Sequence, residues 1–258
     1  MHAAELAQVE EAALQESADE RLSDLVEAEW ESRVLDRGFI RLVGMLGGDD
    51  AVVQSARVSF GSGSKGEEKD RRLIAYLLKH GHETPFEHAV FKFHVKCPFF
   101  VARQWFRHRW ASYNEISGRY TTFDEGEMHL PDGLRVPDQA NRQGSTGRLE
   151  PGQEQELLAV MKAHQEGTWA LYRRLLEAGV AKEIAREVLP LSTYTQFYWT
   201  VNARSLMNFI RLRAEQHAQY EIRLYAVAFM EVFRLKMPWT CEAFQELVFK
   251  GLSTGLEG

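Results

Sequence analysis

The residues that could do chemistry gather in one stretch, residues 107–120, which reads RHRWASYNEISGRY. Basic side chains there surround a single acid: Arg107, His108, Arg109, Arg119 and Glu115. Planar, forked guanidinium groups suit phosphates and flat heterocycles that carry several acceptors. The triplet 117–119, Ser-Gly-Arg, adds a hydroxyl, a backbone N–H that a ligand can approach closely and a bidentate cation. A solvated turn is the alternative, but the stretch is too rich in arginine and too poor in acids for a balanced solvated surface.

Composition limits the class of ligand. The chain has 258 residues, 26% of them charged, and a formal net charge of −6. Proteins that bind polymeric nucleic acid usually carry the opposite sign over the binding surface. The basic residues are instead concentrated at 103–119 and 204–213, which fits a small anionic ligand such as a nucleotide. We therefore expect no nucleic-acid polymer among the partners.

The sequence also carries expectations about location and metals. It has no long apolar run and no signal-peptide pattern, so we expect no membrane association. The two cysteines are far apart and form neither a disulfide framework nor a metal-binding pattern, which favours a reducing cytoplasm. His88 and His94 are close in sequence, but strand alternation would place His94 beside two lysines, a poor environment for a dication. We therefore predict no metal.

Hydrophobic periodicity predicts the elements that must position the reactive residues. Apolar side chains at helical spacing among many acids predict a helical N-terminal extension over 1–35, ahead of a single domain, 36–258. Alternating apolar and polar residues predict strands at 39–43, 90–97 and 193–201. Helical spacing predicts helices at 49–57, 70–79, 157 to about 179, 181–189 and 205 to about 236. Without strand–helix–strand alternation, the fold class is α+β, with an antiparallel or mixed sheet and long helices.

Two of these elements are candidates for positioning ligand groups. The helix that follows Pro98 would present Gln104, Arg107 and His108 on one face, because positions three and four apart lie together. In the long C-terminal helix, Arg213 and His217 would share a face for the same reason. Ordinary surface arginines on a capped helix are the alternative for the second case, and composition alone leaves both open.

A third candidate is the segment 81–88. Thr84 can cap a helix, Pro85 suits its first position, and Glu87 would close a capping box. The free N–H groups of such a helix start attract anions, so a ligand contact and a purely structural turn are both possible. The segment 124–154, rich in Gly, Pro, Asp, Gln and Arg, has no periodicity, and we assign it no catalytic role.

The candidate nucleophiles are weak. A cysteine thiolate needs basic neighbours or a helix N-terminus, whereas Cys97 and Cys241 both have the sequence surroundings of small core residues. Ser117 has no Ser-His-acid arrangement nearby, so a phosphate contact is its more economical role. The chain has no Gly-x-Gly-x-x-Gly fingerprint and no P-loop. Any flavin or nicotinamide would therefore have to be held without such a fingerprint, and the residues alone do not lead to FAD.

The order of residues in 107–120 is distinctive. It has Arg-His-Arg, seven residues and then Ser, with Asn-Glu two residues before that Ser and Arg-Tyr one residue after it. In this the chain resembles flavin-dependent thymidylate synthases, from about Gly38 to Gly251. The resemblance implies conversion of dUMP to dTMP with methylenetetrahydrofolate as one-carbon donor, FAD as cofactor and NADPH as reductant, without an enzyme cysteine nucleophile. It also implies a homotetramer whose active sites draw on several subunits.

The resemblance further assigns roles to individual residues. Arg213 would contact the uracil ring and stabilise negative charge that develops at O2/N3. Nucleotide contacts, chiefly to the phosphate, would come from Gln104, Ser117, Gly118, Arg119 and Arg186. Contacts to FAD would come from Thr84, His108, Arg109, Glu115, Asn202, Arg204 and Asn208, with Ser59 and His82 as weaker candidates. Arg107 would bridge nucleotide and flavin, and Glu115 would orient arginines or ligand hydroxyls.

Two alternatives come from other classes of function. A non-enzymatic module could bind single-stranded nucleic acid through 107–119 and neighbouring aromatic residues. A flavoenzyme acting on another pyrimidine would use the same arginines. Purified protein that retains FAD would be yellow, which separates the first alternative from the others.

Overall fold

The computed structural model describes residues 30–58, 61, 63–124, 127–139 and 144–249. Its centre is a five-stranded sheet in the order β1-β2-β3-β7-β4, with every neighbouring pair antiparallel. The strands are β1 (Trp30–Val34), β2 (Gly38–Leu46), β3 (Val90–Pro98), β4 (Ser112–Glu115) and β7 (Tyr194–Asn202). The α+β class and the antiparallel sheet are therefore confirmed.

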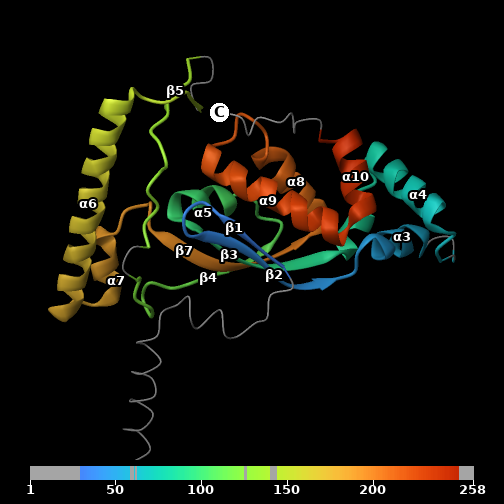
Figure 1. Cartoon of the computed structure of the whole chain (residues 1–258). Coiled ribbons are helices and arrows are strands. Elements are labelled where there is room, and N and C mark those ends of the chain that lie inside the picture. The colour runs from blue at the N-terminus through green and yellow to red at the C-terminus, as the bar shows by residue number, and fades with distance from the viewer. Residues whose placement is uncertain (1–29, 59–60, 62, 125–126, 140–143, 250–258) are drawn as a thin grey trace, which may run out of the picture.

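Helices cover one face of this sheet (Figure 1). Over it lie α5 (Phe99–Trp105), α8 (Ala203–Arg213) and α9 (Tyr220–Lys236), continued at one end by α3 (Asp49–Arg57), α4 (Glu67–Lys79) and α10 (Pro238–Leu247). At the other end stand α6 (Pro151–Glu177), α7 (Lys182–Ala185) and the short 3-10 helix η3 (Arg186–Val188). The smaller elements are the 3-10 helix η2 (Thr84–His88) and the hairpin of β5 (Val136–Pro137) and β6 (Ser145–Thr146). None of the described helices is long and apolar enough to cross a membrane.

The core lies between the sheet and these helices, and Trp105 is at its centre. The Trp105 ring lies 5.3 Å from that of Trp199 in β7, measured between centroids. It lies 4.7 Å from Phe209 of α8 and 5.4 Å from Phe229 of α9. Such aromatic contacts stabilise beyond their buried area. Because Trp105 ends α5, this packing holds the residues that follow it, 107–111, against α8 and β7.

Most of the predicted elements are confirmed. The predicted strands correspond to β2, β3 and β7, and the predicted helices at 49–57, 70–79 and 157–179 correspond to α3, α4 and α6. The helix predicted at 181–189 is α7 followed by η3. The short strand β4 and the helix α10 were not predicted, because β4 has only four residues and α10 lies directly after Met237 at the end of α9.

The predicted helical extension over residues 1–35 is wrong for residues 30–34. Residues 30–34 form β1, with Trp30 opposite Leu42 and Val34 opposite Gly38 of β2. Pairing with a neighbouring strand overrides the local helical spacing, because strand preference depends on tertiary context. The sheet thus begins ahead of the predicted domain boundary at 36. The rest of the predicted extension, residues 1–29, lies outside the described residues.

The single long helix predicted from 205 to 236 is also wrong. It is divided into α8 and α9 by residues 214–219, so Arg213 and His217 do not share a helix face. A continuous helix of that length would extend about 48 Å. Instead the Phe209 ring of α8 packs 5.7 Å from the Phe229 ring of α9, so the two helices lie side by side on one core. That arrangement requires a turn between them.

The helix after Pro98 is shorter than predicted. It ends at Trp105, so Arg107 and His108 lie beyond it rather than on its face. The chain must leave the helix there because β4 pairs with β7, with Ser112 opposite Thr200. Convergence of these side chains therefore depends on tertiary packing and not on helical spacing.

Candidate active site

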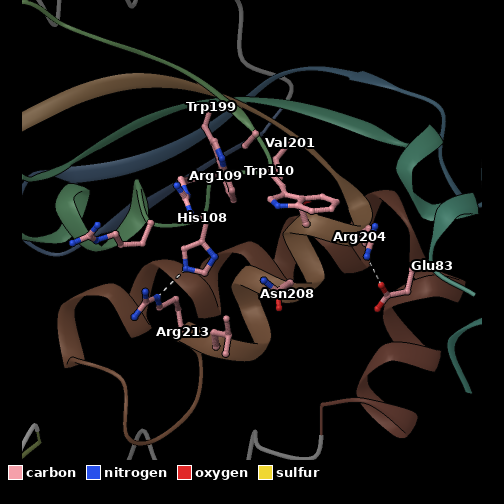
Figure 2. A pocket seen from close by; sticks show the side chains of 13 residues that line it. Glu83, His108, Arg109, Trp110, Trp199, Val201, Arg204, Asn208 and Arg213 are labelled. Carbon is pink, nitrogen blue, oxygen red and sulfur yellow. Dashed lines mark hydrogen bonds and ion pairs between the residues drawn. The ribbon is translucent and has the colours of Figure 1, made fainter. Parts of the chain in front are cut away.

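A cavity of about 510 Å³ lies between the segment after α5, strand β7 and helix α8. Figure 2 shows its lining side chains from close by. The sequence-predicted site residues among them are Arg107, His108, Arg109, Arg204, Asn208 and Arg213. The exposed indole of Trp110 adds a flat apolar surface, and the buried indole of Trp199 lies in the cavity wall. The structure thus brings four guanidinium groups together with aromatic rings in one place.

Arg213 and His108 form the best-defined contact of this cavity. Arg213 Nε donates to His108 Nε2 at 3.0 Å, drawn as a dashed line in Figure 2. Burial and the charge of Arg213 lower the pKa of His108 to about 4. The imidazole is therefore neutral near pH 7 and can accept this hydrogen bond. Burial also lowers the pKa of Arg213, although a guanidinium keeps its proton in proteins. The pair fixes one edge of the Arg213 fork, and a hydrogen bond from Nη2 to the Gln104 backbone oxygen at 3.4 Å holds it further.

A second anchored arginine, Arg204, lies at the other end of the cavity. Its guanidinium pairs with Glu87 at 2.5 Å and with Glu83 at 2.7 Å, and it lies 5.1 Å from the Trp110 ring. Figure 2 shows the Arg204–Glu83 contact. The predicted capping box at Thr84 is wrong, because no side chain caps η2 and Glu87 binds Arg204 instead. A tertiary ion pair takes the place of the predicted local hydrogen bond.

Several predicted flavin-binding residues lie next to this cavity rather than in its lining. Asn202 caps α8, its side-chain oxygen accepting from Ser205 N at 2.8 Å. Thr84 and His82 flank Glu83, which does line the cavity, but both are exposed. Ser59 lies outside the described residues.

Glu115 and Ser117 line a separate cavity of about 260 Å³, with Tyr198 and His94. Thr195 Oγ1 donates to Glu115 Oε1 at 2.7 Å. Although more than a third of Glu115 is exposed, partial burial of its carboxyl raises its pKa, and the Thr195 hydrogen bond opposes that rise. The structure therefore does not place Glu115 among the arginines of residues 107–109.

The remaining predicted nucleotide contacts form a third group beside α7. A Cβ on Gly118 would lie 2.8 Å from the Phe123 ring and 3.1 Å from Arg186 Cδ, so the absence of a side chain allows this close packing. Arg119 Nε contacts Glu183 of α7 at 3.1 Å. Gly118, Arg119 and Arg186 are thus neighbours, and both arginines are exposed.

Gln104 is next to Arg213 and apart from that third group. Its backbone oxygen accepts from the Arg213 guanidinium at 3.4 Å, and its side chain donates to Gln219 Oε1 at 2.5 Å. The phosphate contact expected of Gln104 stays a prediction, whereas its position next to Arg213 is defined by these two hydrogen bonds. That position associates Gln104 with the group predicted to touch uracil.

Both cysteines are fully buried, as the sequence suggested. Burial raises the pKa of Cys97 well above its usual value, with a smaller effect of the Glu115 charge. Burial likewise raises the pKa of Cys241. Neither thiol is activated as a thiolate. Among the described residues, no group of three or more His, Cys, Asp or Glu side chains could hold a metal ion.

The donor set of the main cavity fits a flavin nucleotide. Guanidinium groups suit its phosphates and ring carbonyls, and exposed indole surface such as that of Trp110 suits its planar ring. Sequence reasoning missed seven of the thirteen lining residues: Glu83, Trp110, Ala111, Trp199, Val201, Ser205 and Leu212. Trp110 and Ser205 lie within segments that it singled out, so proximity in sequence was an available signal. Glu83 and Leu212 lie in such segments too, 81–88 and 204–213, and Ala111 lies in 107–120. Trp199 and Val201 belong to the predicted strand 193–201, whose alternation gave no signal of a site.

Comparisons with known proteins agree with this site. The family model described as "Thymidylate synthase complementing protein" matches residues 41–239. The flavin-dependent thymidylate synthase of Thermosipho africanus is 53% identical over 221 residues, 86% of this chain and 96% of the relative. That of a Thermus thermophilus strain is 50% identical over 218 residues, 84% of this chain and 79% of the relative. A solved structure of the UMP/dUMP methylase PolB from Streptomyces cacaoi, bound with 5-Br UMP, has a TM-score of 0.75 and 35% identity. It covers 83% of this chain and 96% of PolB.

These matches make the chain an enzyme of the methyltransferase class. Within that class, it belongs to the flavin-dependent thymidylate synthase family. The resemblance inferred from residues 107–120 is confirmed.

Proposed function

We propose that this enzyme converts dUMP to dTMP with FAD as cofactor, methylenetetrahydrofolate as one-carbon donor and NADPH as reductant. The observation that carries the proposal is the cavity lined by Arg107, Arg109, Arg204 and Arg213 together with the exposed indole of Trp110, in a chain of this family. Bound FAD, once reduced, supplies the hydride that the methyl group requires. The protein's share of the reaction is binding, orientation and charge stabilisation.

The residues divide this work between them. Arg204 is held in place by two carboxylates before any ligand binds, so little ordering is needed when it contacts the flavin. Asn208, on the next turn of α8, adds an amide to the same wall. Arg107 and Arg109 supply further guanidinium groups for phosphate and ring oxygens. His108 contributes as a neutral acceptor that orients Arg213.

Arg213 is the group that would activate the uracil. Negative charge develops on the ring oxygens when the ring is attacked, and a fixed guanidinium stabilises it more strongly than water does. Hydrogen bonds to His108 and to the Gln104 carbonyl hold the Arg213 fork in place. With both cysteines buried and their pKa values raised, we propose that no enzyme thiolate takes part.

We also propose a homotetramer with shared active sites. In one chain, the group of Gly118, Arg119 and Arg186 is separate from the cavity lined by Arg213. We propose that one nucleotide contacts both groups and that the two groups come from different copies. Helix α6 also exposes apolar side chains that a second copy could cover: Leu157, Val160, Met161 and Leu171.

Subunit mixing tests this arrangement. Arg186→Ala and Arg213→Ala, assayed at a low dUMP concentration at which each homomer has little activity, should recover part of the activity after dissociation and reassembly together. Intact sites then form where a normal Arg186 meets a normal Arg213 across an interface. If all sites were built within single chains, the mixture would stay as inactive as its components.

The reaction itself is tested by formation of dTMP from dUMP, methylenetetrahydrofolate, FAD and NADPH, each omitted in turn. We expect each omission to abolish product once FAD has been removed from the protein. UMP should be included as a second substrate, because the similar structure is that of a UMP/dUMP methylase. Product with the complete mixture but without NADPH or folate would contradict the proposed co-substrates.

A further inference from the structure

A chain of hydrogen bonds links Gln104 to a buried ion pair that the proposed mechanism does not use. Gln104 Nε2 donates to Gln219 Oε1 at 2.5 Å, and Gln219 Nε2 donates to Glu221 Oε2 at 2.8 Å. The other Glu221 oxygen accepts from Arg135, which comes from the segment before β5. Glu221 is only 4% exposed, at the start of α9. Four residues from three separate segments are thus connected.

Because Glu221 is ionised, the hydrogen bonds from Gln104 through Gln219 to Glu221 must all be donated in one direction. Burial of Glu221 is outweighed by the Arg135 hydrogen bond and charge, so the pKa of Glu221 is lowered and the group is an anion. An anionic carboxylate can only accept hydrogen bonds. Gln219 must therefore turn its NH2 group toward Glu221 and its carbonyl oxygen toward Gln104. Gln104 must in turn give its NH2 group to Gln219.

This leaves only one end of the Gln104 amide for a ligand. Its nitrogen is engaged by Gln219 and also donates to the Phe100 carbonyl oxygen at 3.5 Å. Within the described part of the chain, the amide oxygen of Gln104 has no hydrogen-bond partner. Gln104 is partly exposed, and its backbone oxygen accepts from Arg213. An acceptor is therefore presented close to the arginine proposed to contact uracil.

We propose that Glu221, acting through Gln219, fixes the amide of Gln104 so that its carbonyl oxygen accepts a hydrogen bond from an N–H or O–H group of the nucleotide. This inference rests on the proposed function, because it takes dUMP as the ligand. It makes Glu221 and Gln219 positioning residues, and it assigns Gln104 to a donor of the nucleotide rather than to the phosphate. In dUMP the available donors are uracil N3–H and the 3′-hydroxyl of the deoxyribose.

Arg135 stabilises the Glu221 carboxylate, and this anion sets the direction of the hydrogen bonds. Its guanidinium also donates to Ser145 Oγ at 3.0 Å and lies 4.6 Å from the Tyr220 ring. These contacts attach the β5–β6 hairpin to the start of α9. A segment without any recognisable motif thereby contributes to recognition of the nucleotide.

The sharpest test is a substitution that reverses the orientation of the Gln104 side-chain amide. In Gln219→Lys, the ammonium can pair with Glu221 but can only donate toward Gln104, which must then turn its carbonyl oxygen inward. Gln219 is exposed, so the variant should fold. Gln216→Lys is the matched control, since it adds the same charge to an exposed position of the same loop. Dissociation constants for the FAD-loaded enzymes are measured by calorimetry with dUMP, its N3-methyl analogue and its 3′-deoxy analogue.

The readout is the ratio of the dissociation constants of analogue and dUMP. In the unchanged enzyme and in Gln216→Lys, one analogue should bind roughly 5-fold or more weakly than dUMP, because the acceptor of Gln104 is left unpaired. That analogue identifies the donor. In Gln219→Lys and in Gln104→Met, the same ratio should fall several-fold toward one. A purely structural role would weaken dUMP and analogues equally and leave the ratio unchanged.

The outcomes separate this inference from the function on which it rests. Unchanged ratios in Gln219→Lys and Gln104→Met, with dUMP still bound, would overturn the positioning role alone. Failure of the FAD-loaded, unchanged enzyme to bind dUMP would instead overturn the proposed function. Equal loss of discrimination in the Gln216→Lys control would show that added charge, not amide direction, causes the effect, and would also refute the inference.

Discussion

Lowering the pH from 7 toward 4 should protonate His108 and break its hydrogen bond with Arg213. Burial and the Arg213 charge set the pKa of His108 at about 4 in the folded protein, against 6.5 for the unperturbed group. With that value, about one molecule in a thousand carries the proton at pH 7. Arg213 donates to Nε2, so the neutral ring must carry its hydrogen on Nδ1.

The sign of the effect on stability follows from the lowered pKa. Between pH 6.5 and 4 the unfolded chain binds this proton and the folded chain does not, so the free energy of unfolding falls as the pH falls. The contribution is fully present above pH 6.5. From pH 7 to 5 it amounts to at most about 2 kcal/mol, and solvent around the partly exposed ring reduces it further.

The assay is urea unfolding at fixed protein concentration, at pH 7 and pH 5. Other groups titrate as well, so the quantity of interest is the difference between the unchanged protein and His108→Asn, which keeps an acceptor for Arg213 without a titrating ring. We expect His108→Asn to lose less stability between the two pH values. His217→Asn, at an exposed position, is the control and should behave like the unchanged protein. Identical pH dependence in all three proteins, or an imidazole resonance of His108 that titrates near 6.5, would refute the reasoning.

Three further predictions concern chemistry and binding. Cys97→Ser with Cys241→Ser should keep dTMP synthesis, because both thiols are buried and their pKa values are raised; a folded double variant without turnover would contradict this. Arg119→Ala and Arg186→Ala should each weaken dUMP binding by about 1.5–3 kcal/mol, the value of a charge-assisted hydrogen bond, and FAD binding far less. Separate titrations with dUMP and with FAD check this, and equal loss of both would indicate a structural role. Arg213→Lys keeps the charge but not the fork, so dTMP formation should fall roughly 100-fold or more while NADPH still reduces the flavin. For Arg213→Lys, stopped-flow flavin reduction is measured beside dTMP formation. Equal loss of both rates would contradict a role of Arg213 in uracil activation.

The sequence by itself determined the chemistry of the site and most of the elements. The guanidinium groups of 107–109 and the order of residues through Tyr120 predicted a ligand with phosphates and a heterocycle, and indicated the family. Alternation predicted β3 and β7, two of the three inner strands, because it reports on side chains directed to opposite faces of a sheet. Burial of both cysteines also followed from residue type and position.

Only the tertiary structure decided which of these residues meet. Helical spacing placed His108 beside Gln104, whereas the contact of His108 is with Arg213, more than a hundred residues away. Glu87 binds Arg204 rather than a local backbone N–H, and the predicted long helix divides so that both halves can bury their aromatic faces on Trp105. Local patterns record what each side chain can do and which face it prefers. Its partner is chosen by the packing of the whole core, because burying apolar area brings together segments whose separation along the chain carries no signal.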